Sequence, residues 1–151
     1  MEIRKGGLDQ PTVQALIRLH RAEASESTPI CNAHSLDPDG LARPGVTFFS
    51  AWDGSTLLGM AALRELGPDH AEIKSMRTAP AALRRGVARA LLDHLIATAR
   101  GRGYARLSLE TGTAPMFGPA NSLYERAGFT DCSAFGGYPE SAHNRFMTMM
   151  L

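Results

Sequence analysis

An arginine-rich loop is the part of the chain whose residue types are best suited to bind a small anion. It lies within 76–92, where Gly86 and the small residue Ala88 stand at the start of a helical pattern. The first turn of a helix has unpaired backbone N–H groups and the positive end of its dipole. A pyrophosphate can bind there when no bulky side chain intervenes, and neighbouring arginines add charge-assisted hydrogen bonds. The alternative is an ordinary helix start exposed to solvent.

The charge distribution points to the same region. The whole chain of 151 residues has 16 basic and 15 acidic residues, a net charge of +1. Between Arg77 and Arg106, however, seven arginines stand against a single acidic residue, Asp93, a local charge of +6. This excess favours one small polyanion or a docking face, with a solvated helix face as the alternative. The near-neutral total disfavours binding to nucleic acid or to an anionic membrane.

The absence of several known motifs excludes other classes of protein. No G-x-x-x-x-G-K-S/T motif occurs, and the loop lacks the G-x-G-x-x-G of a dinucleotide-binding fold. The five histidines, with Cys31 and Cys132, show no metal-ligand spacing, so no metal site is predicted. The isolated cysteines, the lack of a signal-peptide pattern and the absence of an apolar run of about 18 residues indicate a cytoplasmic protein without a membrane span.

The elements that must position the loop alternate between strands and helices in one predicted domain, 1–151. Strands are predicted at 1–5, 46–52, 56–66, 72–78, 105–110, 130–134 and 146–151. Helices are predicted from 9 onward, at 37–42, from 86 to about 101, and at 119–127. The pattern predicts a mixed α+β domain in which the strands at 72–78 and 105–110 are parallel, because a helix connects them.

Two less regular features accompany these elements. A polar insertion at 25–44 is typical of a binding loop, and its His34 and Asp37 could contact a substrate. On the first predicted helix, His20 shares an apolar face with Val13, which favours a core histidine over a catalytic one.

Three motifs in order resemble the GCN5-related N-acetyltransferase (GNAT) family. The sequence LRRGVA at 83–88 is similar to its pyrophosphate loop, Arg/Gln-x-x-Gly-x-Gly/Ala, although Leu83 departs from the first position. The strand AEIKSM at 71–76 precedes that loop at the family's spacing. The sequence ANSLYERAGF at 120–129 resembles A-x-x-x-Y-x-x-x-G-F, with Met116 where an asparagine is frequent. The sequences SLETG, FGGY and RFMTMML are similar to a branch of small bacterial GNAT proteins.

The resemblance implies an acyl-CoA N-acyltransferase fold with a V-shaped splay between the fourth and fifth strands, in which acetyl-CoA would lie. Main-chain groups of Met76 and Thr78 would pair with its pantetheine arm, and backbone N–H groups from Arg84 to Ala90 would hold its pyrophosphate. The implied cofactor-binding residues are Met76, Arg77, Thr78, Arg84, Arg85, Gly86, Val87, Ala88, Arg89 and Ala90.

The implied chemistry is direct attack of an amine on the thioester, which requires that the amine first lose a proton. Glu72 is the first candidate for the base; its alternative is a solvent-facing strand carboxylate that pairs with Lys74. Glu110 is the second candidate and could bind the ammonium group, or it is structural. Tyr124 would protonate the leaving thiolate, or it only packs at the helix–strand junction.

The sequence therefore favours an acetyl-CoA-dependent N-acetyltransferase that acts on a small amine or a protein N-terminus. A non-catalytic acyl-CoA-binding or regulatory module is the alternative; Leu83 and Met116 favour it, and Glu72 and Tyr124 disfavour it. An acetyltransferase of charged tRNA is disfavoured because the chain outside the basic interval is acidic. The resemblance leaves a homodimer open and does not identify the acceptor.

Overall fold

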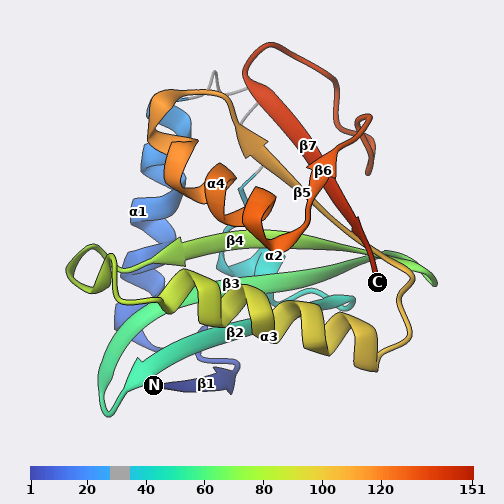
Figure 1. The fold of residues 1–151 in the computed structure, drawn as a ribbon. Coiled ribbons are helices and arrows are strands. Elements are labelled where there is room, and N and C mark those ends of the chain that lie inside the picture. Colours follow the sequence, from blue (N-terminus) through green and yellow to red (C-terminus); the bar gives the residue numbers. More distant parts are fainter. Residues whose placement is uncertain (28–34) are drawn as a thin grey trace.

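A single mixed sheet organises the computed structural model, which describes residues 1–27 and 35–151 (Figure 1). Cys31 and His34 therefore lie outside the described residues. The strands are β1 (Glu2–Lys5), β2 (Val46–Asp53), β3 (Thr56–Gly67), β4 (His70–Thr78), β5 (Arg106–Gly112), β6 (Thr130–Asp131) and β7 (Asn144–Met150). The helices are α1 (Pro11–Ser27), α2 (Pro38–Leu41), α3 (Val87–Gly101) and α4 (Gly118–Ala127), with short 3-10 turns η2 (Pro80–Ala82) and η3 (Pro115–Phe117).

The order of strands in the sheet is β1-β2-β3-β4-β5-β7-β6. Its two central strands, β4 and β5, are parallel, and all other neighbouring pairs are antiparallel. The predicted mixed α+β architecture and the parallel central pair are thus confirmed. None of the helices in the described part of the chain is long and apolar enough to cross a membrane.

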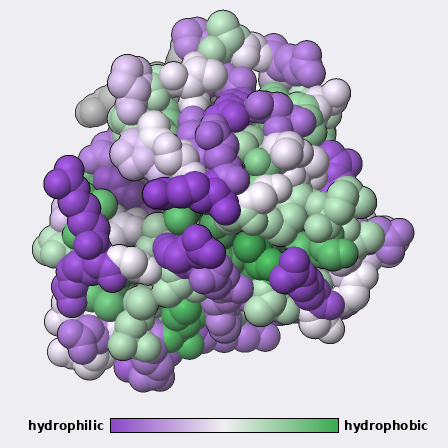
Figure 2. All heavy atoms as spheres, in the orientation of Figure 1, coloured by the Kyte–Doolittle hydropathy of each residue, from purple (hydrophilic) through white to green (hydrophobic). Residues whose placement is uncertain are grey.

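Both faces of the sheet are covered by helices. One core contains Leu91 and Leu95 of α3 together with Phe49 of β2. The other contains Val13 and Ile17 of α1 together with neighbouring residues of β2, Phe48 and Trp52. Successive side chains of a strand point to opposite faces, which is why β2 contributes to both cores. Over α3, hydrophilic and hydrophobic side chains are interspersed on the face seen in Figure 2.

One predicted strand is much shorter than expected. Instead of 130–134, β6 comprises only Thr130–Asp131, which pair with Thr148 and Met147 of β7. The Cys132 N–H still donates to the Phe146 carbonyl, but the chain then enters a turn at 135–138 in which Gly136 and Gly137 both have positive φ. Pairing with β7 thus ends near Cys132, and the two left-handed glycines reverse the chain a few residues later.

The central parallel pair separates after only four residues on each strand. Pairing runs from His70 opposite Arg106 to Ile73 opposite Leu109 and stops there. A β-bulge follows on β4, where the register against β3 shifts and Ser75 has a φ of 54°. Meanwhile β5 stays paired with β7 as far as Gly112. The two strands therefore diverge, and the predicted V-shaped splay between them is confirmed.

The splayed half of β4 depends on close packing at Gly59 of β3. A Cβ there would lie 2.9 Å from the Arg77 carbonyl oxygen and 2.9 Å from Cγ1 of Val87, the first residue of α3. Overpacking at such a site forces backbone shifts that cost about 1 to 3 kcal/mol. We expect Gly59→Ala to lower the free energy of unfolding in urea by that amount.

The matched control is Gly67→Ala in the same strand, because a Cβ at Gly67 would meet nothing within 4 Å. Equal losses in the two variants would contradict the assignment of Gly59 as a position of close backbone approach.

Candidate active site

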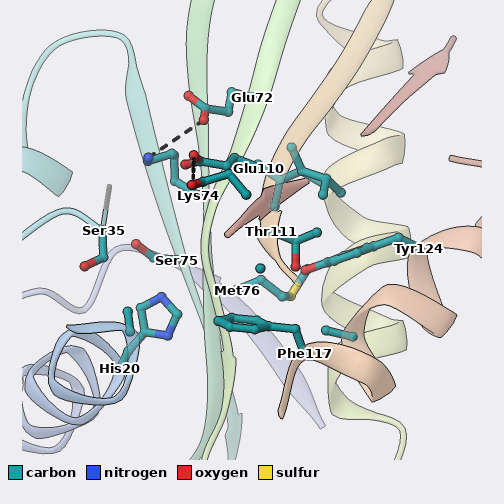
Figure 3. Close-up of a pocket in the computed structure, with 16 residues that line it drawn as sticks. His20, Ser35, Glu72, Lys74, Ser75, Met76, Glu110, Thr111, Phe117 and Tyr124 are labelled. Atoms are coloured by element: carbon teal, nitrogen blue, oxygen red, sulfur yellow. Dashed lines mark hydrogen bonds and ion pairs between the residues drawn. The ribbon is translucent and has the colours of Figure 1, made fainter. Parts of the chain in front are cut away.

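A cavity of about 140 Å³ lies in the splay between β4 and β5 (Figure 3). It is lined by His20, Ala24, Ser35, Glu72, Ile73, Lys74, Ser75, Met76, Leu109, Glu110, Thr111, Gly112, Phe117, Ala120, Tyr124 and Asn144. The three predicted catalytic residues, which the sequence distributes over two strands and a helix, thus line one cavity.

Glu72 lies fully buried in a cluster of charged groups on the β4 side. Its Oε2 lies 3.7 Å from Nζ of Lys74, and its Oε1 lies 3.6 Å from a guanidinium nitrogen of Arg64. The Tyr138 hydroxyl donates to Oε1 at 3.2 Å and accepts from Lys74 at 2.9 Å and Arg64 at 3.1 Å. The expected pairing of Glu72 with Lys74 is present, but the solvent-facing placement is wrong because Tyr138 and its neighbours exclude water.

Burial and charge act in opposite directions on this pair. Burial raises the pKa of Glu72, whereas Lys74, the Tyr138 hydroxyl and Arg64 lower it. Burial lowers the pKa of Lys74, and Glu72 and Glu110 raise it. Burial and the Glu72 carboxylate raise the pKa of Tyr138, so this phenol remains a hydrogen-bond donor at neutral pH. Each charge in the cluster therefore depends on the opposite charge beside it.

A local turn brings Tyr138 to β4. The Tyr138 N–H donates to the Phe135 carbonyl at 3.1 Å, and the two glycines between them supply the positive φ values that this turn requires. The Tyr138 ring then stacks on Phe146 of β7, and Nζ of Lys74 lies 5.0 Å from the ring centroid. The FGGY sequence thus forms the turn that completes the buried cluster.

Glu110 lies across the splay on β5. The side-chain amide of Asn144, the first residue of β7, donates to its Oε2 at 2.5 Å. Figure 3 shows the Glu110 carboxylate close to Lys74 and within the cavity. Unlike Glu72, Glu110 is only partly buried. The two candidate carboxylates therefore face the same cavity from different strands.

Tyr124 of α4 supplies a phenol on the opposite side of the cavity. Its ring is 6% exposed and packs edge-to-face against Phe129, while its hydroxyl points into the cavity (Figure 3). Burial raises the pKa of Tyr124 to about 12, so the hydroxyl is protonated at neutral pH. Asn121 fixes α4 against β5, since its side chain accepts from Thr111 and donates to the Gly112 carbonyl.

The predicted pyrophosphate loop leads into α3 through two residues with left-handed backbone conformation. Arg84 and Gly86 both have positive φ, and α3 begins directly after Gly86. A Cβ on Gly86 would meet nothing within 4 Å, so a ligand could approach the backbone there. The prediction that the Ala90 N–H holds the pyrophosphate is wrong, because this N–H already donates to the Gly86 carbonyl at 3.0 Å. The side chain of Val87 is buried, which leaves only its backbone N–H to face a ligand.

The remaining predicted cofactor residues differ in what their side chains can contact. Met76 lines the cavity. Arg77 forms an ion pair with Glu23 of α1, and Arg89 forms one with Asp93 on the exposed side of α3. Arg85 is exposed in the loop, and Thr78 lies opposite Gly59 in the sheet. The loop and the cavity thus lie at the same end of β4. The side chains of two predicted arginines, Arg77 and Arg89, form ion pairs with carboxylates of the protein.

Several residues of the site were not predicted from the sequence. The sequence predicts no role for Tyr138 or Asn144 and places His20 in the core. In the structure His20 and Asn144 line the cavity. Tyr138 forms hydrogen bonds to two other lining residues, Glu72 and Lys74. Asp37, a suggested substrate contact, instead caps α2 by accepting from the Gly40 N–H at 2.8 Å. The described residues contain no group of three His, Cys, Asp or Glu side chains that could hold a metal ion.

This chain belongs to the GNAT family, since the family described as "Acetyltransferase (GNAT) family" matches residues 13–129. It is 44% identical over 149 residues to the Uncharacterized N-acetyltransferase YedL of Escherichia coli (strain K12), covering 99% of this chain and 94% of that protein. It is also 44% identical over 151 residues to the Uncharacterized N-acetyltransferase YsnE of Bacillus subtilis (strain 168), covering 100% of both.

A crystal structure of a Bacillus subtilis acetyltransferase in complex with CoA shares the fold, with a TM-score of 0.74 and 19% identity over 99% of this chain and 98% of that one. Family membership and the two N-acetyltransferase relatives identify this chain as an acetyl-CoA-dependent N-acetyltransferase.

The buried charge cluster makes Lys74 sensitive to substitution. Lys74→Met removes the buried cation beside the buried Glu72 carboxylate, and breaking a buried pair in this way costs about 3 kcal/mol or more. The double variant Glu72→Gln with Lys74→Met removes both charges, so we expect it to recover part of that loss. Urea unfolding of the three proteins measures these differences.

The control is Arg89→Met, which breaks the exposed Arg89–Asp93 pair and should change stability by no more than about 0.5 kcal/mol. A Lys74→Met variant as stable as this control would show that the buried pair contributes nothing.

Proposed function

We propose that this enzyme transfers the acetyl group of acetyl-CoA directly to a small primary amine bound in the cavity between β4 and β5. The observation that carries the proposal is the convergence of the Tyr124 hydroxyl and the Glu72 and Glu110 carboxylates on this one cavity. Tyr124 acts as the general acid, and Glu110 binds and deprotonates the amine. We also place the enzyme in the cytoplasm, where a free cysteine such as Cys132 stays reduced.

Acetyl-CoA would bind along the splayed half of β4 and the start of α3. Beyond Ile73, the edge of β4 that faces β5 has no strand partner, so its main-chain groups can pair with the pantetheine arm. The N–H groups of Val87, Ala88 and Arg89 belong to the first turn of α3 and have no acceptor within the helix. Together with the exposed Arg84 and Arg85, they form a suitable site for the pyrophosphate.

The reaction forms one bond and breaks one. The amine nitrogen attacks the thioester carbonyl carbon, and the carbon–sulfur bond breaks when the tetrahedral intermediate collapses. The proton lost by the amine passes to the Glu110 carboxylate, directly or through a water molecule. The Tyr124 hydroxyl donates its proton to the departing CoA sulfur and regains one from solvent.

The surroundings of the two carboxylates favour Glu110 over Glu72 as the base. Glu72 is fully buried and accepts from Tyr138 between two cations, an arrangement that stabilises its charge and limits its access to an amine. Glu110 is partly buried, lines the cavity and accepts a hydrogen bond from the Asn144 side-chain amide. Glu110 is therefore the carboxylate that an incoming ammonium group can contact.

Tyr124→Phe tests the general acid. We expect kcat to fall by about 10²-fold, because general acid catalysis contributes at least that much. The affinity for acetyl-CoA, measured by calorimetry, should stay close to that of the unmodified enzyme. Tyr104→Phe is the matched control, since the Tyr104 hydroxyl bonds to the exposed Glu65 outside the cavity. Unchanged kcat in Tyr124→Phe would remove the acid role, and failure of the unmodified enzyme to bind acetyl-CoA would refute the proposal.

Glu110→Gln tests the base through its pH dependence. We expect kcat/KM to fall by about 10²-fold near neutral pH, where most of the amine is protonated. The deficit should shrink as pH rises toward the pKa of the amine, because free amine then needs no base. A deficit that is independent of pH would indicate a positioning role. A deficit that shrinks with pH in Glu72→Gln but not in Glu110→Gln would assign the base to Glu72.

A further inference from the structure

Two buried polar atoms on the α1 side of the cavity have no hydrogen-bond partner among the residues that the structure describes. They are Nδ1 of His20 and Oγ of Ser75, and both residues line the cavity. A buried donor or acceptor that stays unsatisfied is expensive, and native proteins contain few of them. Two on one wall of the cavity mark a place where water, or a ligand that displaces it, can complete their hydrogen bonds.

Ser75 is held in this position by the bulge on β4. It has a φ of 54°, a left-handed conformation that is rare for residues other than glycine, and it is 9% exposed. Figure 3 shows its hydroxyl on the same side of β4 as His20 and Ser35. The strained backbone therefore presents a buried hydroxyl to the cavity, opposite the helix that carries His20.

The surroundings of His20 keep its ring neutral, so that one ring nitrogen can donate a hydrogen bond. Burial first, and then the neighbouring Arg77, lower the pKa of His20 to about 4, so its ring is neutral at pH 7. Of the charged groups that act on this ring, Arg77 and Lys74 are cations and Glu23 is the single carboxylate. A neutral imidazole can carry its one N–H proton on Nδ1 and donate a hydrogen bond from it. The Ser75 hydroxyl can donate a second hydrogen bond beside it.

We propose that His20 and Ser75 form a subsite for the carboxylate of the acceptor, which makes the acceptor a free amino acid. Each residue donates one hydrogen bond to the carboxylate, while the amino group of the same molecule lies toward Glu110 on the far side of the splay. This inference rests on the proposed acetyl transfer in the same cavity. It distinguishes a free amino acid from a protein N-terminus, which has an amide in place of the carboxylate.

Three pools of acceptors that share one set of side chains test the proposal: amino acids, their carboxamides and the corresponding amino alcohols. CoA release from acetyl-CoA is measured with each pool. We expect kcat/KM for the amino acids to exceed that for either other pool by about tenfold or more, because charge-assisted hydrogen bonds are lost in the others.

The subsite is then tested with His20→Ala and Ser75→Ala. Each should raise KM for the amino acids about tenfold while leaving kcat and the affinity for acetyl-CoA nearly unchanged. His20→Asn retains an N–H donor and should restore part of the affinity. Ser55→Ala, in the exposed turn between β2 and β3, is the matched control. An equal loss with all three pools would indicate a structural role for His20 and Ser75 and would contradict the subsite.

The outcomes separate this inference from the proposed function. Equal or better use of the carboxamides or amino alcohols overturns the amino-acid assignment while leaving acetyl transfer intact. Binding of acetyl-CoA without CoA release in any pool also overturns it, because an enzyme for free amino acids must act on one of them. Failure to bind acetyl-CoA overturns the proposed function itself.

Discussion

The separation of β4 from β5 is the constraint on which the rest of the structure depends. Two parallel strands in one sheet normally share their hydrogen bonds along their length, yet here pairing ends at Ile73 and Leu109. The bulge at Ser75 and the close approach of α3 at Gly59 hold β4 in its divergent path, and pairing with β7 holds β5 in the other. The unpaired edge of β4 and the cavity follow from this divergence, and the proposed pyrophosphate site at the start of α3 lies near the point where the strands part.

Opening the sheet exposes polar groups in its interior, and the protein balances them in different ways. On the β4 side, Glu72, Lys74 and Tyr138 bond to one another, which stabilises the buried charges without water. On the β5 side, Asn144 satisfies part of Glu110 and leaves its carboxylate facing the cavity. A buried network around Glu72 and a partly buried carboxylate at Glu110 thus line the same cavity from two strands, and this difference in burial supports the different roles proposed for two residues of the same type.

Local patterns predicted most of the fold and half of the site. Helical periodicity and Gly86 located α3 and the loop before it, because those signals come from neighbouring residues. Family motifs brought Glu72, Glu110 and Tyr124 to one place, although their roles stay predictions. The pairing of Glu72 with Lys74 could be predicted because the two residues are close in the sequence, but the Tyr138 partner could not, since it is 66 residues away along the chain. The bulge at Ser75 could not be predicted either, because it depends on the register between β3 and β4. The length of β6 could not be predicted because it depends on where pairing with β7 ends.

Tyr138 lies in the segment between β6 and β7, and this position has a consequence for how the acceptor specificity of related enzymes can change. The residues proposed to bind the cofactor come from one contiguous stretch, β4 to α3. The proposed acceptor side is assembled from α1, β4 and β5, and a distant turn supplies Tyr138, which holds Glu72 and Lys74. Substitutions in that turn can therefore change the electrostatics and shape of the acceptor side while the cofactor half stays intact. The same scaffold can in this way acquire new acceptors through changes in a short surface connection, without redesign of the transfer chemistry.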